Sequence, residues 1–145
     1  MGARKRNKAE QRKESRKTVY SAVLRNCPSS PRKMRLVADL IRGTDVNKAL
    51  DILRYNAKDA SKDMEKLVMS AVSNWQIKNE SVRLEDSKLI IKEIFVDQAR
   101  TLKRIRPAPQ GRAYRVRKRS NHVTVILGNM NEETEIIKEI EVKTN

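Results

Sequence analysis

A run of like charge, RTLKRIRPAPQGRAYRVRKRSNH, occupies residues 100–122 and limits how this chain can fold. Nine of its residues are Lys or Arg, and no Asp or Glu stands between Asp97 and Glu132. Neighbouring charges of one sign repel each other, so this segment is poorly suited to an ordinary protein core. We therefore expect it to protrude from the protein and to become ordered when a polyanion surrounds it.

Patterns on either side of this run predict a long β-hairpin. Residues 89–96 (LIIKEIFV) are typical of a strand, and apolar residues alternate over 123–127. Between them RPAPQG has turn chemistry, with two prolines and a glycine free to take a positive φ. Residues 89–105 then pair with 112–127 in arms of about 15 residues, on the order of 50 Å long. Ordinary strands have about five or six residues, so the ribbon should project, with cations opposed across it and on both faces.

The rest of the chain predicts a sheet strand and three helices. A β-branched run over 18–25 suggests the strand. Ser30 and Pro31 start one helix, which Gly43 ends, and Asp45 starts a second. The third helix has apolar residues at steps of three and four: Met64, Leu67, Val68, Ala71, Val72 and Trp75. The predicted fold class is α+β, with three helices packed on a small, mainly antiparallel three-stranded sheet.

Length and charge divide the chain into one domain with two flanking segments. The 145 residues are the size of a single domain. Residues 1–17 form a basic N-terminal arm that we expect to be mobile or ordered by a partner. Residues 18–128 form the domain, with its extended hairpin at about 97–122. Residues 129–145 form an acidic tail, which could add a strand or a loose helix.

Composition indicates a nucleic-acid partner first and an anionic membrane second. There are 33 Lys and Arg against 18 Asp and Glu, a formal charge of +15. Aromatic residues are only 3% of the chain, so phosphate and shape contacts are a better expectation than base stacking. No apolar run reaches the roughly 18 residues of a membrane span, and no signal peptide opens the chain, so we expect a soluble intracellular protein.

The sequence gives no support to an enzyme or to a metal or cofactor site. The single cysteine, Cys27, is expected to be a small, partly buried residue. The single histidine, His122, has no nucleophile or carboxylate pair in the pattern around it, and we interpret it as a polar residue at a strand start. Tyr114 could stack on a base or pack across the ribbon.

Two separate motifs resemble the bacterial large-subunit ribosomal protein twenty-two family. One is SPRKMRLVADLIRG at residues 30–43; the other is the hairpin pattern LKR at 102–104, QGRA at 110–113, RKR at 117–119 and HV at 122–123. The resemblance covers roughly residues 18–127. It implies a small α+β domain that binds large-subunit ribosomal RNA, supports subunit assembly and places its hairpin along the nascent-peptide exit tunnel.

The resemblance also implies the site and the partners. RNA-binding residues would be Arg32, Lys33, Arg35, Arg100, Lys103, Arg104, Arg106, Arg112, Arg115, Arg117, Lys118, Arg119 and His122. The hairpin tip near the tunnel would be Pro107, Ala108, Pro109, Gln110 and Gly111, where many family members have Arg-Ala in place of Ala108-Pro109. Expected partners are large-subunit ribosomal RNA, neighbouring large-subunit proteins and the nascent polypeptide, with no membrane and no cofactor. The expected location is the cytoplasm, in the large subunit of the bacterial ribosome.

Other function classes stay open on the residues alone. The helices flanking Gly43 and Thr44 could form a DNA-binding helix-turn-helix, although the second would expose a mixed set of side chains with little power to read base edges. A peripheral membrane protein held by the basic arm is a third possibility, and the arm lacks apolar anchors. The cations at 32–35 could equally be a solvated helix face or, beside the helix N-terminus, a phosphate site.

Overall fold

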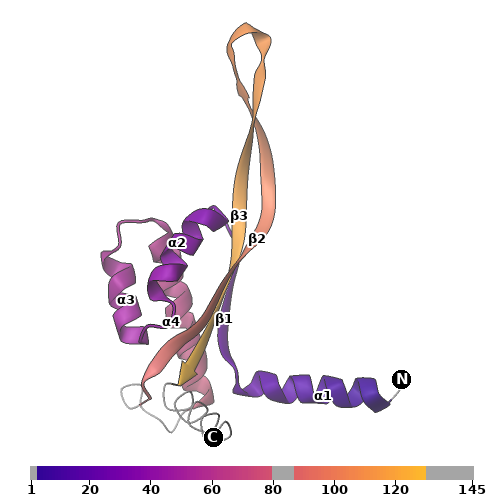
Figure 1. The fold of residues 1–145 in the computed structure, drawn as a ribbon, viewed down its shortest axis with the longest axis vertical. Helices are drawn as coiled ribbons and strands as arrows, with labels where there is room; N and C mark the ends of the chain where they lie inside the picture. Colours follow the sequence, from indigo (N-terminus) through magenta and orange to yellow (C-terminus); the bar gives the residue numbers. More distant parts are fainter. Residues whose placement is uncertain (1–2, 80–86, 130–145) are drawn as a thin grey trace, which may run out of the picture.

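The computed structural model describes residues 3–79 and 87–129 (Figure 1). In order, the elements are α1 (Ala3–Thr18), β1 (Tyr20–Cys27), α2 (Pro31–Ile41), α3 (Val46–Tyr55), α4 (Ala60–Lys78), β2 (Leu89–Pro107), a 3-10 turn (Pro109–Gly111) and β3 (Ala113–Asn129). The strands form one antiparallel sheet in the order β1-β3-β2. The predicted α+β class is confirmed, and the described residues contain one helix, α1, beyond the three expected.

Local signals fix the start and end of α2 and α3. Ser30 takes the extended N-cap conformation before Pro31, without a side-chain cap bond. Asp45 caps α3, where its carboxylate accepts from the backbone N–H of Asn47 and Lys48. Between the helices, Gly43 has φ +72° and the Thr44 N–H donates to the Ile41 carbonyl at 3.2 Å. The predicted helix boundaries at Ser30, Gly43 and Asp45 are confirmed.

Replacing Gly43 with Ala is expected to destabilise the domain by about 1–2 kcal/mol, because an L side chain resists a positive φ. A Cβ there would meet nothing within 4 Å, so the loss comes from the backbone alone. Urea denaturation of the variant and the wild type measures this loss of unfolding free energy. Gly43→Asn, a residue that tolerates this conformation, should lose less, and equal losses for both variants would contradict the explanation.

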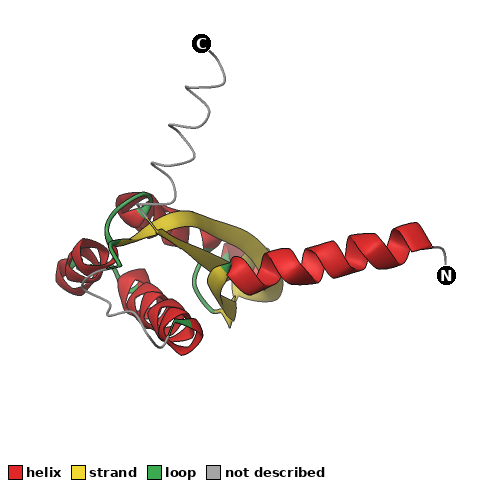
Figure 2. Ribbon diagram, turned by 90° about the horizontal axis from the view of Figure 1, so that it is seen from below, coloured by secondary structure: helices red, strands yellow, loops and turns green. Residues whose placement is uncertain are grey.

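The core lies between α2–α4 and one face of the sheet. Met64, Val68 and Ala71 on α4 are fully buried, with Val123 and Val125 of β3 opposite them in the same cluster. The apolar stripe predicted for α4 is therefore core. The other sheet face is open, since Val23 and Phe95 are about half exposed. Figure 2 shows α2–α4 gathered beside the sheet while α1 points away from them.

Strands β2 and β3 continue past the core as a two-stranded ribbon, the predicted hairpin (Figure 1). Pairing runs from Leu89 opposite Asn129 to Pro107 opposite Ala113. The register shifts by one residue between Ile91 and Glu93 and again between Gln98 and Thr101. Bulges of this kind increase twist and re-aim a strand. The second lies where the ribbon leaves the body, so it sets which side chains each face of the ribbon presents.

Three expectations differ from the structure or fall outside it. Cations were expected to oppose one another across the ribbon, but between Thr101 and Pro107, all described, only Lys103 and Arg117 do so. Residues 3–18, which include most of the basic arm that was expected to be mobile or ordered by a partner, form a helix. The acidic tail lies outside the described residues except for Asn129, which ends β3, and the polar turn region at 79–87 lies mostly outside them.

Candidate nucleic-acid interface

The two faces of the ribbon carry different side chains, because residues paired across antiparallel strands share a face. The first, here called the arginine face, continues the side of the sheet that carries the core. Its cations are Lys103, Arg115, Arg117 and Arg119, with Thr101 and Ile105 among them. The second, here called the mixed face, alternates cations with apolar and aromatic groups: Leu102, Arg104, Arg106, Tyr114, Val116 and Lys118. Both faces can therefore meet a polyanion at once.

These side chains extend into solvent. Every residue from Leu102 to Pro107 and from Gly111 to Arg119 is exposed, and Ile105 and Tyr114 are 74% and 64% exposed. Tyr114 stands opposite Arg106. At that exposure it is not packed across the ribbon, and its ring is accessible to a partner. Of the two interpretations of Tyr114, the structure favours the one in which the ring faces outward.

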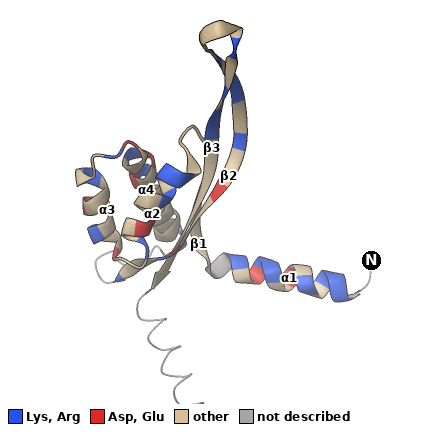
Figure 3. Ribbon diagram, turned by 45° about the horizontal axis from the view of Figure 1, so that its top comes forward, with Lys and Arg blue, Asp and Glu red and all other residues tan. Residues whose placement is uncertain are grey.

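The hairpin charge is not neutralised by the described part of the chain. Ion pairs among described residues join Arg6 to Glu10, Arg42 to Asp39, Arg54 to Glu65 and Lys62 to Asp59, all within the helical part. Figure 3 shows the ribbon blue along both strands with one acidic band near its base. Arg104 donates to the Lys103 carbonyl at 2.9 Å, which leaves its charge unpaired. The field of the hairpin is thus available to an external anion.

The hairpin tip is compact and uncharged. The Ala108 N–H donates to the Arg112 carbonyl at 2.9 Å, and both Gln110 and Gly111 take positive φ, +61° and +71°. The predicted role of Gly111 in the turn is confirmed; the left-handed Gln110 was not foreseen. Residues 107–111 contain no charge and are flanked by Arg106 and Arg112. The tip therefore differs chemically from the arms that carry it.

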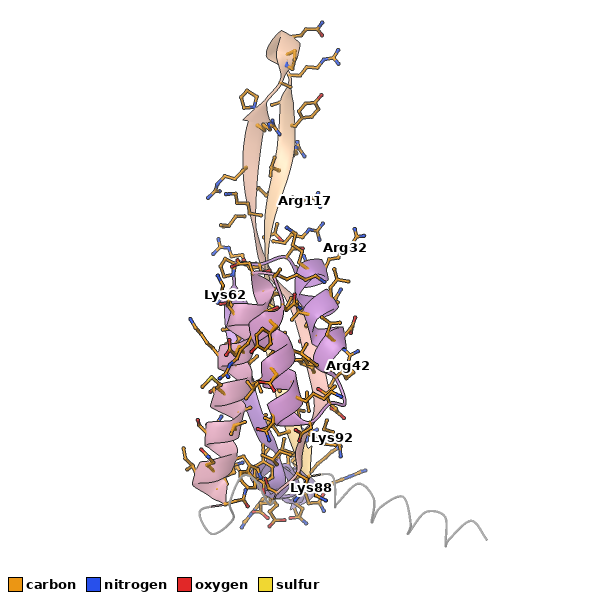
Figure 4. All side chains as sticks on the ribbon, turned by 90° about the vertical axis from the view of Figure 1, so that its left-hand side faces the viewer. Arg32, Arg42, Lys62, Lys88, Lys92 and Arg117 are labelled. Carbon is orange, nitrogen blue, oxygen red and sulfur yellow. The ribbon has the colours of Figure 1, made fainter. Side chains whose placement is uncertain are left out.

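The α2 cations do not share one role. Arg32 and Lys33 are exposed and have no ion pair with a described residue. Arg35 instead donates from Nη2 to the Val96 carbonyl at 2.9 Å, which ties α2 to β2. Figure 4 shows Arg32 near the level where the ribbon leaves the body, close below Arg117. The N-terminus of α2 and the base of the hairpin thus present cations together.

The His122 ring forms a hydrogen bond with the backbone of β1. Its Nδ1 accepts from the backbone N–H of Asn26 at 3.0 Å, where Asn26 holds φ +56° at the end of β1. Because Nδ1 accepts, the ring proton sits on Nε2. The ring is half-buried at the base of the ribbon, so Nε2–H is the atom left for an external acceptor.

Three cations that the sequence patterns did not single out lie on the body below the base of the hairpin. In Figure 4, Arg42, Lys92 and Lys88 follow one another down the same side of the body below Arg117 and Arg32. Arg42 directly follows α2, Lys88 directly precedes β2, and Lys92 lies in β2. The end of α2 and the start of β2 are joined by the Arg42 Nη2 bond to the Ile94 carbonyl and by the Gly43 N–H bond to the Ile91 carbonyl. The helical spacing of α2 did not indicate that Arg42 joins this group, because Arg42 lies one residue beyond the end of the helix.

The lone cysteine has the features of a core residue. Cys27 is 3% exposed and its Sγ donates to Asp63 Oδ2 at 3.3 Å. Burial, with a smaller contribution from Asp63, raises the pKa of the thiol above its ordinary value. A thiol that stays protonated is a poor nucleophile. No group of three metal-ligating side chains occurs among residues 3–79 and 87–129, and no helix there is long and apolar enough to cross a bilayer.

Comparison with known proteins agrees with this architecture. The family profile described as ribosomal protein L22p/L17e matches residues 22–128. The large ribosomal subunit protein uL22 of Christiangramia forsetii is 62% identical over 88% of this chain and 95% of its own length. The uL22 proteins of Flavobacterium psychrophilum and Porphyromonas gingivalis are 59% and 60% identical over 90% of this chain and 96% and 97% of theirs. The chain therefore belongs to the ribosomal protein L22p/L17e family, a family of structural ribosomal proteins and not of enzymes.

Proposed function

We propose that this protein binds large-subunit ribosomal RNA through its hairpin and the N-terminus of α2, supports assembly of the subunit and lays the hairpin along the nascent-peptide exit tunnel. The observation that carries the proposal is the ribbon itself, whose nine cations have no ion pair with any described residue. Relatives about 60% identical are named large ribosomal subunit proteins, which supports the RNA of that subunit as the partner.

The two faces of the ribbon support insertion between RNA segments more than docking on one surface. A ribbon that lay on a single partner would need cations on one face only. Here the arginine face offers four cations and the mixed face three, Arg104, Arg106 and Lys118. Neutralising phosphates on both sides releases counterions and lets RNA segments approach one another. Arg also suits this role because its planar fork matches phosphate and stacks on bases.

The uncharged tip supports a tunnel position for residues 107–111. A segment surrounded by phosphate gains from cations, as the flanking arms do, while a segment that faces water and a passing polypeptide does not need them. A cationic lumen contact would also hold acidic nascent chains. In this chain the change from charged arms to a neutral tip between Arg106 and Arg112 fits such a boundary, although a neutral tip is not a requirement of the position, since many family members have Arg-Ala in place of Ala108-Pro109.

Two measurements test the proposal. Affinity for large-subunit ribosomal RNA, measured between 50 and 200 mM salt, should fall by about three to five orders of magnitude if six to ten phosphates are contacted. A flat response would contradict RNA binding. For the tunnel, a photo-crosslinking amino acid at Gln110 should capture a stalled nascent chain in assembled ribosomes, and the same group at Tyr55, which is 90% exposed on α3, should not. Capture at Tyr55 alone would refute the tunnel assignment.

A further inference from the structure

Helix α1 is a second basic element, and it lies outside the residues that match the family profile. Its 16 residues include eight Lys or Arg and two Glu. Every side chain described on it is exposed. Figures 1 and 2 show it extending from the base of β1, away from both the hairpin and α2–α4. It is therefore free to meet a partner at a different place from the ribbon.

The charges of α1 are sorted around its axis. At about 100° per residue, cations recurring every fourth residue follow one side of the helix, here called the α1 stripe: Arg4, Lys8, Arg12 and Arg16. Both acids fall elsewhere, and Glu10 pairs with Arg6 at 3.0 Å. No stripe cation has an ion pair with a described residue. The stripe spans about 18 Å at about 1.5 Å per residue.

Nothing in the described core explains this helix. Its only apolar residues are Ala3 and Ala9, so it has no face to bury. Like charges four residues apart destabilise a helix, and isolated helices of this length are marginal in water. An external anion along the stripe would remove that repulsion and stabilise the helix.

The stripe continues onto the body. Arg16 lines a surface hollow of about 730 Å³ together with Arg25 of β1 and Lys78 of α4. Lys78 is held in place there, since its Nζ donates to the Val19 carbonyl at 2.9 Å and lies 5.3 Å above the Tyr20 ring. A row of cations that begins on a free helix thus ends on cations fixed to the folded domain.

We propose that the α1 stripe binds the phosphate backbone of a double-helical segment of large-subunit ribosomal RNA, as a contact separate from the hairpin. This inference rests on the proposed function. An evenly spaced row of cations along a helix is complementary to the regular row of phosphates on a duplex, which proteins recognise by shape and backbone contacts. An anionic bilayer is a poorer fit, because α1 has no Trp, Phe or Leu to insert.

Two charge-matched variants of the full chain test the stripe. One carries Lys8→Gln, Arg12→Gln and Arg16→Gln; the control carries Arg6→Gln, Lys13→Gln and Lys17→Gln, at positions outside the α1 stripe and on average about 120° around the helix axis from the three substituted stripe positions. The first should lower affinity for large-subunit ribosomal RNA on the order of a hundredfold near 150 mM salt and reduce the salt slope by about 2 to 3. The control should change affinity less than about threefold.

The outcomes separate this inference from the proposed function. If the wild type binds RNA and both variants lose affinity equally, or neither loses any, the proposal that the α1 stripe binds RNA is refuted. RNA binding by the protein as a whole then still stands. Failure of the wild type to bind refutes the proposed function itself. Stripe-dependent co-sedimentation with phosphatidylserine vesicles, without an effect on RNA binding, also overturns it in favour of a membrane.

RNA cleavage by an iron chelate attached to α1 locates the RNA segment that this helix contacts. An iron chelate attached at Ala9→Cys in a Cys27→Ser background should cleave both strands of one RNA duplex in the complex. Cleavage confined to single-stranded loops would overturn the duplex assignment.

Discussion

Replacing Lys103, Arg115, Arg117 and Arg119 together with Gln is expected to lower affinity for large-subunit ribosomal RNA by about a thousandfold at physiological salt. Each neutralised phosphate contributes roughly 0.9 to the slope of log affinity against log salt. Losing four such contacts lowers the affinity by about three orders of magnitude near 0.15 M salt. These four side chains are exposed and have no ion pair with a described residue, so their removal should leave the fold intact.

A control with the same loss of charge separates position from net charge. Lys48, Lys58, Lys62 and Lys66 are exposed on the α3–α4 side of the body, and replacing them with Gln also removes four charges. If the long-range field alone governed binding, the two variants would weaken it equally. We expect the control to lose less than about tenfold, with a salt slope close to that of the wild type. Equal slopes in the two variants would contradict a hairpin contact.

The existence of the hairpin was predictable because its signals are local. Alternation of apolar residues, two prolines with a glycine at 106–111 and the absence of acids all point to a protruding ribbon. Which residues of β2 share a face with which residues of β3 was not predictable. Side-chain direction in a strand alternates with period two, so one inserted residue exchanges the faces. The register shift between Gln98 and Thr101 does this, and no residue type at 98–101 marks it.

Arg35 and His122 show why site residues are harder to predict than elements. Both belong to the motifs that resemble the family, and a free cation or imidazole there suggests an RNA contact. In the structure the Arg35 guanidinium donates a hydrogen bond to the Val96 carbonyl, and the His122 ring accepts one from the Asn26 backbone N–H. Their bonding partners lie 61 and 96 residues away in the chain. Only the tertiary fold brings such groups together. Their assignment to RNA stays a prediction, now confined to the atoms that these bonds leave available.

Helix α1 was missed for a different reason. Residues 1–17 lack an apolar stripe, which argues against any element that must pack on a core. The same residues, Ala, Arg, Lys, Gln and Glu, have high intrinsic helix propensity. Pattern and propensity therefore disagree for these residues, and the prediction of a mobile or partner-ordered arm rests on the pattern alone. A helix stabilised without a core has to be detected by propensity and by the sorting of its charges around the axis.

Met64→Ala is expected to destabilise the domain by about 2–5 kcal/mol, because Met64 is fully buried and its truncation leaves a cavity. Met69→Ala on the same helix is the matched control. Because Met69 is half exposed, this substitution should lower the free energy of unfolding by less than about 0.5 kcal/mol. Trp75, the single tryptophan, is buried on α4 and reports urea unfolding by fluorescence.

Core and interface should respond independently to these substitutions. The Met64 side chain lies in the cluster under the sheet, while the four arginine-face cations lie beyond the register shift between Gln98 and Thr101. At a temperature where Met64→Ala is still folded, its affinity for ribosomal RNA should therefore stay within about threefold of the wild type, because every phosphate contact is retained. Conversely, loss of the four arginine-face cations should leave the urea midpoint almost unchanged. If Met64→Ala weakened RNA binding while folded as much as loss of those cations does, the body would be shaping the contact surface, and the hairpin would not be the autonomous binding element that its exposure implies.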